Sequence, residues 1–116
     1  MRKTFALAEE RNPRAVVIAM QADPHFEAPS GSHARRGFED FLRALEQEVA
    51  SFHGPVLLIH GDTHRYRVDH PLRDPRSDSP FANFTRLETF GSPHMGWVKV
   101  TVDPSRPELF LIEPVR

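Results

Sequence analysis

Two short, uninterrupted apolar segments constrain the fold of this chain more than any other feature. The first covers residues 15–20 (AVVIAM) and the second covers residues 56–59 (VLLI). Neither segment alternates apolar with polar residues, which is typical of strands that are buried on both faces of a sheet. Buried strands of this kind occur mainly in parallel sheets, where helices cover the faces. The sequence therefore predicts an α/β fold.

The segment between the two apolar runs predicts an amphipathic helix over residues 37–52. Its apolar residues recur with a period of 3.6 and form one stripe, and Gly54-Pro55 follows as a helix-ending pair. A strand, a helix and a second strand in this order predict a βαβ unit with adjacent parallel strands. The residues of the stripe are Phe38, Phe41, Leu42, Leu45, Val49 and Phe52.

The remaining segments are predicted from local composition. Residues 2–11 contain good helix formers and are followed by Asn12-Pro13, a pair that ends helices. Residues 69–82 contain three prolines and few apolar side chains, which indicates a long irregular loop. Three β-like segments separated by turn residues then predict a carboxyl-terminal antiparallel meander. These segments are 83–90, 96–102 and 108–113.

Composition excludes several classes of function. The 116 residues form one small domain or part of a larger one, and 15 Lys+Arg against 16 Asp+Glu give a net charge of −1. That balance argues against a nucleic-acid binder, which would carry a basic excess. The absence of cysteine excludes disulfides, thiolate nucleophiles and cysteine zinc sites. No apolar run approaches the roughly 18 residues of a membrane span, and the amino-terminal sequence turns acidic too early for a signal peptide.

The sequence HGDTH at residues 60–64 carries the clearest chemical signal. It follows a predicted buried strand directly, and open α/β sheets bind ligands at the carboxyl ends of their strands. In extended chain, His60, Asp62 and His64 share one face. Two imidazoles and a carboxylate are suited to a divalent metal such as Mn, Fe or Zn. Asp62 could instead orient His64, and an ordinary strand-ending turn also explains the motif.

The end of the first predicted strand carries a second polar group, with Gln21 and Asp23. Adjacent parallel strands end at the same edge of a sheet, so we expect these residues to lie near HGDTH. Arg65 and Arg67 follow the motif and are close enough to contact an anionic substrate, although a solvated surface pair is the more common arrangement. No nucleophile elbow, phosphate loop or dinucleotide motif occurs in the sequence.

The order of these segments resembles the carboxyl-terminal half of the calcineurin-like metallophosphoesterases. The resemblance rests on AVVIAMQADP, the amphipathic helix, PVLLIHGDTH and NFTRLETFGSPHMGWVKVTVD. It implies half of a two-sheet sandwich flanked by helices, and an intact protein in which a metal-activated water attacks a phosphate ester. Gly61-Asp62-Thr63-His64 would stand on the family's Gly-His-x-His motif, and Gln21 on its strand-end histidine. The resemblance thus implies His64 and Asp62 as metal ligands, with His60 and Gln21 beside the metal or its ligands.

The earlier motifs of that family are missing from the chain. The only asparagines are Asn12 and Asn83, and neither follows glycine, so the Gly-Asn-His motif is absent. We therefore interpret residues 1–116 as a single partial domain, a fragment or a degenerate member of the family with a weak or incomplete metal site. The alternatives are a non-catalytic module that keeps the sheet for partner binding, and a truncated product that does not fold stably. A half-sandwich would expose an apolar sheet face, which predicts self-association.

Overall fold

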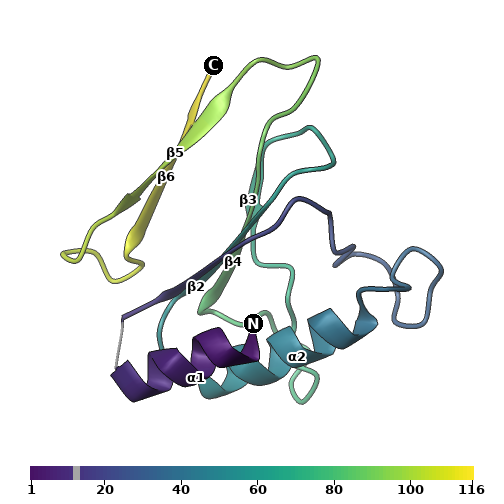
Figure 1. Ribbon diagram of the computed structural model, residues 1–116, viewed down its shortest axis with the longest axis vertical. Coiled ribbons are helices and arrows are strands. Elements are labelled where there is room, and N and C mark those ends of the chain that lie inside the picture. The colour runs from purple at the N-terminus through teal and green to yellow at the C-terminus, as the bar shows by residue number, and fades with distance from the viewer. Residues whose placement is uncertain (12–13) are drawn as a thin grey trace.

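The structure is a computed structural model that describes residues 1–11 and 14–116 (Figure 1). The helix-ending pair predicted at Asn12-Pro13 lies outside the described residues. The helices are α1 (Arg2–Arg11) and α2 (Glu39–Ser51). The strands are β1 (Val16–Ala19), β2 (Val56–His60), β3 (Arg67–Asp69), β4 (Phe84–Glu88), β5 (Trp97–Val102) and β6 (Phe110–Val115).

Four of the strands form one mixed sheet in the order β1-β2-β4-β3. The pairs β1–β2 and β2–β4 are parallel, whereas β3 runs antiparallel to β4. The predicted βαβ unit is confirmed, because β1 and β2 are adjacent and parallel with α2 between them in the chain. The carboxyl ends of β1, β2 and β4 consequently lie together at one edge of the sheet.

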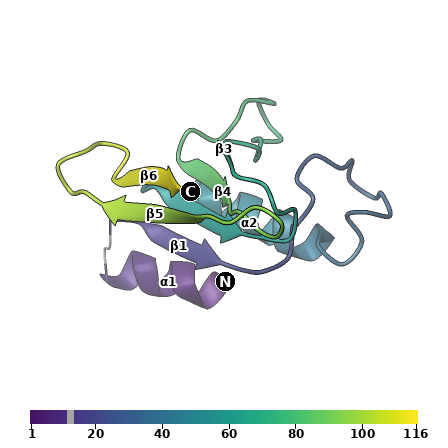
Figure 2. The same ribbon diagram turned by 90° about the horizontal axis from the view of Figure 1, so that it is seen from above.

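Both helices lie on the same side of this sheet, as the two ribbon views show (Figures 1 and 2). The apolar stripe of α2 forms the core there. Two acidic residues in the first turn of α2 lie at the positive end of its helix dipole, where they stabilise the helix. The core also contains Phe5 and Ala8 of α1. Its central side chains are Leu42, Leu45 and Val49 of α2 with Val56, Leu58 and Phe84 of the sheet.

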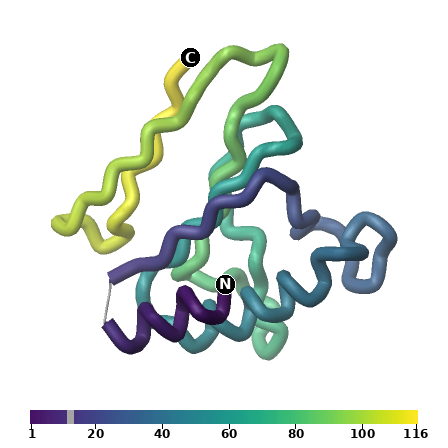
Figure 3. Tube along the Cα trace, viewed as in Figure 1, coloured from purple at the N-terminus to yellow at the C-terminus, as the bar shows by residue number. Residues whose placement is uncertain are grey.

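Strands β5 and β6 form a separate antiparallel hairpin on the other side of the sheet (Figure 2). A cavity of about 550 Å³ separates the two layers and is lined by Val68 and Thr85 of the sheet and by Phe110 and Ile112 of the hairpin. The amino terminus lies beside the helices, and the carboxyl terminus lies at the end of the hairpin (Figure 3). The hairpin is therefore a short second layer over the sheet.

The prediction of a three-stranded meander is wrong for its first segment. Residues 84–88 form β4, which is parallel to β2 inside the main sheet, so only β5 and β6 pair as an antiparallel unit. Residues 61–83 make this possible, because they cross back along the sheet and include the unpredicted strand β3. Turn residues mark where a strand ends but do not specify its partner. Among the described residues, no helix is long and apolar enough to cross a membrane.

Candidate metal centre

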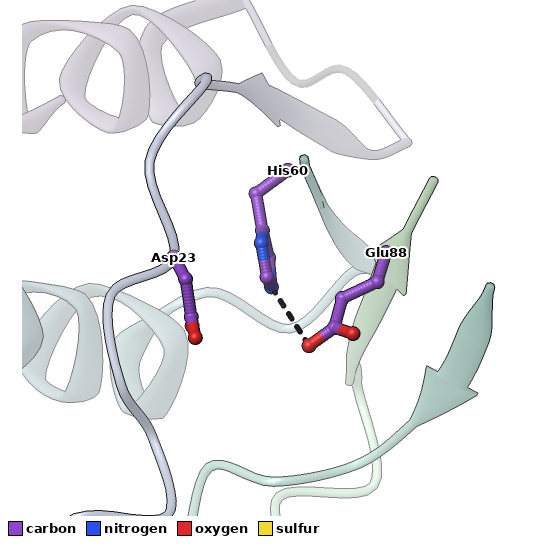
Figure 4. Close-up of side chains that lie close together, drawn as sticks. All are labelled: Asp23, His60 and Glu88. Atoms are coloured by element: carbon purple, nitrogen blue, oxygen red, sulfur yellow. Dashed lines mark ion pairs between the residues drawn. The ribbon is translucent and has the colours of Figure 1, made fainter. Parts of the chain in front are cut away.

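Three ionisable side chains meet at the carboxyl edge of the parallel strands. His60 is the last residue of β2 and Glu88 the last residue of β4, and the sheet register pairs them directly. Because side chains alternate along a strand, both lie on the helix side of the sheet, as do Leu58 and Phe84. Asp23 reaches the same point from the loop after β1. Figure 4 shows the imidazole of His60 between the two carboxylates.

The local chain holds Asp23 in this position. Its Oδ1 accepts a hydrogen bond of 2.9 Å from the His25 amide, as in a typical Asx turn. Its own amide donates to Oδ2 of Asp62 over 3.3 Å. One ligand atom from each of Asp23, His60 and Glu88 lies within 4.8 Å of the other two, and all three residues are buried. We call these three residues the triad.

The ring of His60 has one nitrogen with a partner and one without. Nδ1 lies 2.9 Å from the carbonyl oxygen of Gly61, so Nδ1 carries a hydrogen that it donates to this oxygen. Nε2 is buried, lies 3.6 Å from Oε1 of Glu88 and has no hydrogen-bond partner in the described part of the chain. In the neutral ring, its lone pair thus faces a carboxylate. A second ring proton or a metal ion would remove this repulsion.

Glu88 is ionised at neutral pH despite its burial. Burial by itself raises the pKa of Glu88, but hydrogen bonds from Arg67 and Thr63 outweigh it, together with the charges of Arg67 and Arg86. The net result is that the pKa of Glu88 lies below its usual value. The Thr63 hydroxyl donates to Oε2 over 3.0 Å, and Nη1 of Arg86 lies 3.3 Å from Oε1. Glu88 is therefore a fixed negative charge.

The backbone around the triad adopts left-handed conformations that ordinary residues rarely use. The φ angles are +59° at His25, +77° at Asp62 and +63° at His64. The Thr63 amide donates to the Gly61 carbonyl over 3.0 Å, which closes a tight γ-turn at Asp62. Such residues cost roughly 1–3 kcal/mol each and are concentrated at binding and active sites. HGDTH is thus a strained turn at the end of β2, and not the extended chain that would place His60, Asp62 and His64 on one face.

Of the four residues predicted as metal ligands, only His60 belongs to the triad. The approach of the first loop to HGDTH is confirmed, because the Gly61 amide donates to the Gln21 carbonyl over 3.1 Å. The side chain of Gln21 is exposed. Asp62 is also exposed and supports Asp23 through the bond to its amide.

His64 is exposed and is held away from the triad. Its Nδ1 lies 2.7 Å from the Ser92 carbonyl, to which it donates a hydrogen bond. Gly91 permits this contact, because a Cβ at that position would lie 2.6 Å from the His64 ring. Metal ligation by Gln21, Asp62 and His64 stays a prediction.

Glu88 was not predicted as a site residue, although the sequence contains a signal for it. In FTRLE (84–88), charged residues at 86 and 88 share the face of Phe84, which indicates ion pairs inside the core. Its ionic partners Arg65 and Arg67 were predicted only as a pair near the site. Arg67 pairs with Glu88 across strands β3 and β4, and Nε of Arg65 lies 3.4 Å from Oε2 of Glu88.

Comparisons with known proteins assign no family to this arrangement. No protein-family model matches the sequence, and no curated protein and no solved structure shows a significant similarity to the chain. The assignment of a metal site to this chain therefore rests on its sequence and structure alone. A buried triad of two carboxylates and one imidazole, at the carboxyl edge of a mixed α/β sheet, could hold a metal ion.

Proposed function

We propose that this chain binds a divalent cation at Asp23, His60 and Glu88, and that it is part of a metallophosphoesterase-like domain. In the intact protein that domain would hydrolyse phosphate esters. The observation that carries the proposal is the buried Nε2 of His60, which faces two carboxylates and has no hydrogen-bond partner in the described chain. A lone pair and two carboxylates aimed at one point are what a cation requires.

The dimensions of the triad fit an ion of this kind. Two ligands at about 2.1 Å from a tetrahedral ion lie about 3.4 Å apart. The 3.6 Å between Nε2 of His60 and Oε1 of Glu88 matches that spacing, and a ligand atom of Asp23 lies within 4.8 Å of the other two residues' ligand atoms. Nδ1 of His60 already donates to the Gly61 carbonyl, which leaves Nε2 as the ligand nitrogen. One nitrogen and two oxygens suit Mn, Fe or Zn.

The charges around the triad also favour a cation. The triad and the ion-pair network that Glu88 joins contain four carboxylates against three guanidinium groups, one of which is largely exposed. Asp62 adds a further carboxylate at the rim through its bond to the Asp23 amide. The carboxylates are those of Asp23, Glu27, Asp69 and Glu88, and the guanidinium groups are those of Arg65, Arg67 and Arg86.

Phosphate-ester chemistry is the part of the proposal that rests on the resemblance and on the site's position. The triad lies where open parallel sheets bind ligands, and the hairpin forms a second layer, as in half of a sandwich. A bound divalent metal lowers the pKa of water and polarises a phosphoryl oxygen. The chain's own residues would hold the metal, and Arg65, whose side chain is 63% exposed beside Glu88, would attract the anionic ester.

Calorimetric titration with Mn²⁺ and Zn²⁺ tests the metal site. We expect the His60→Ala variant to lose binding, because the only imidazole in the triad is removed. The matched control is His33→Ala, which removes an exposed imidazole from the loop before α2 and should leave binding unchanged. Equal binding by the wild-type and His60→Ala proteins would contradict the proposal.

A phosphatase assay with an aryl phosphate tests the partial-domain half of the proposal. With one three-residue site and no upstream ligand motifs, turnover by these 116 residues should be close to the uncatalysed rate even with saturating metal. Robust metal-dependent turnover that His60→Ala abolishes would show instead that the chain is a sufficient catalyst.

A non-catalytic partner-binding role is the second candidate, and one edge of the sheet, strand β1, favours it. Edge strand β3 carries charges at Arg67 and Asp69, which discourage strand addition. Edge strand β1 consists of four apolar residues, and Val17 is 50% exposed. We expect the isolated chain to self-associate through this uncovered surface. Sedimentation velocity checks the expectation, and a monomer with a single sharp thermal transition would contradict it.

A further inference from the structure

We infer that Arg67 is an internal competitor for the cation site and leaves Glu88 when a divalent cation binds. The inference rests on the proposed metal site and adds a regulatory residue to it. Its basis is that Arg67 already occupies the oxygen of Glu88 that the proposed cation would need as a ligand. Nη2 of Arg67 contacts Oε1 of Glu88, the same oxygen that faces the unpartnered Nε2 of His60 at 3.6 Å. A metal ion held by His60 and this oxygen would be placed beside the guanidinium.

The sheet brings Arg67 to this position. The antiparallel register of β3 and β4 pairs Arg67 directly with Glu88, so the two residues lie on the same face. The Arg67 side chain is 26% exposed, whereas the Glu88 side chain is fully buried. Arg67 is therefore the partly exposed partner of a fully buried carboxylate.

Arg67 has an alternative partner that allows it to leave Glu88. Its Nη2 also lies 3.0 Å from Oε1 of Glu27, a carboxylate whose side chain is 50% exposed. Nε of Arg67 is buried and forms no hydrogen bond with any described residue, although it is 3.8 Å from Oδ2 of Asp69. The contact of Arg67 with Glu88 is thus one of several contacts that its guanidinium makes with carboxylates. A shift toward Glu27 would keep the guanidinium paired.

Neither of the other two arginines near Glu88 has both this freedom and this position, although Nη1 of Arg86 lies 3.3 Å from Oε1. Arg86 is fully buried and forms two bonds with Asp69, at 2.7 and 2.6 Å, which fix its guanidinium. Arg65 contacts the other oxygen, Oε2, over 3.4 Å, and its side chain is 63% exposed. Arg67 alone of the three combines contact with Oε1, partial exposure and a second carboxylate.

Two consequences follow from competition for Oε1. First, the guanidinium weakens cation binding, since the ion must displace a positive charge from its ligand. Second, the cation and Arg67 exchange places at Glu88, which couples metal loading to the position of a side chain at the mouth of the site. Loading would turn Arg67 toward the surface, where it can contact an anionic group beside the metal.

Titration of the wild-type, Arg67→Gln, Arg67→Lys and Arg73→Gln proteins with Mn²⁺ tests the inference. Arg67→Gln should bind about 10-fold more tightly or better than wild type, because removal of one adjacent charge changes such equilibria by at least that factor. Arg67→Lys keeps the charge and should bind less tightly than Arg67→Gln. Arg73→Gln, the matched control, should remain within about threefold of wild type, because Arg73 is 59% exposed and pairs with Asp78 rather than with Glu88.

The outcomes separate this inference from the proposed function. Binding by wild type with no gain in Arg67→Gln would overturn the competition and leave the metal site standing. No binding by any of the four proteins would overturn both. Because Arg67→Gln could unfold, the wild-type protein supplies a second readout in its Arg67 Nε–Hε NMR signal, assigned by comparison with Arg67→Lys. Saturation with Zn²⁺, which is diamagnetic, should shift this signal, and an unchanged signal would overturn the inference.

Discussion

Replacement of Arg86 by methionine is expected to lower the free energy of unfolding by about 3–5 kcal/mol, the cost of removing one partner from a buried ion pair. The Arg86 side chain is fully buried and donates two hydrogen bonds to the Asp69 carboxylate. Its Nη1 lies 3.3 Å from Oε1 of the buried Glu88. Its guanidinium also lies 5.3 Å from the ring centre of Phe26. Methionine keeps the apolar stem but leaves the carboxylate of Glu88 with one cationic neighbour fewer.

Urea unfolding of wild type and Arg86→Met measures this effect. Arg73→Met is the matched control, because Arg73 is 59% exposed and lies 3.9 Å from Asp78, a pair of the kind that contributes about 0–1 kcal/mol. If Arg86→Met and Arg73→Met are equally stable, the charged residues near β4 form a surface cluster, and the buried network described here is wrong.

Replacement of Leu45 by alanine is expected to cost about 2–5 kcal/mol, as for other buried leucines. Leu45 is fully buried in the centre of α2 and belongs to the core between that helix and the sheet. Alanine is a better helix former than leucine, so the loss would come from the cavity and the lost apolar contacts and not from the helix itself.

The control for Leu45→Ala is Leu7→Ala on α1. Leu7 is 46% exposed, so its truncation removes less buried surface and should cost clearly less. Thermal or urea unfolding of both variants provides the comparison. A cost below about 0.5 kcal/mol for Leu45→Ala would place it among surface substitutions, and α2 would then not be the helix that covers the sheet.

The βαβ unit could be predicted because each part has its own periodic signal. Uninterrupted apolar runs indicate buried strands, and the stripe of α2 indicates the face that covers them. The position of β4 could not be predicted in the same way. Its sequence indicates a strand, but its pairing with β2 depends on how residues 61–83 return along the sheet. Local sequence patterns do not contain that long-range information.

The site was predicted in its location and only partly in its residues. The rule that parallel strands end at one edge placed Gln21, Asp23 and HGDTH together, and the hydrogen bonds between them confirm this. The rule of extended alternation failed beyond His60, because Asp62 and His64 adopt left-handed conformations that turn their side chains out of the strand pattern. The third member of the triad, Glu88, depended on the unpredicted pairing of β2 with β4.

The structure leaves two physical explanations for the unpartnered nitrogen of His60. A second ring proton would form an ion pair with Glu88 and would need no metal. A divalent cation would use the same geometry and would also bind the carboxylates of Asp23 and Glu88. Only the second explanation predicts a site that binds a divalent ion.

A crystal structure of the zinc-soaked protein, with anomalous diffraction recorded at the zinc edge, tests the central claim most directly. The account predicts one anomalous peak on the helix side of the sheet edge, with Nε2 of His60, Asp23 and Glu88 at about 2.0–2.2 Å from it. Arg67 should no longer contact Glu88 in that structure. A peak held by Asp62 and His64, with His60 still paired to Glu88 alone, would contradict the account.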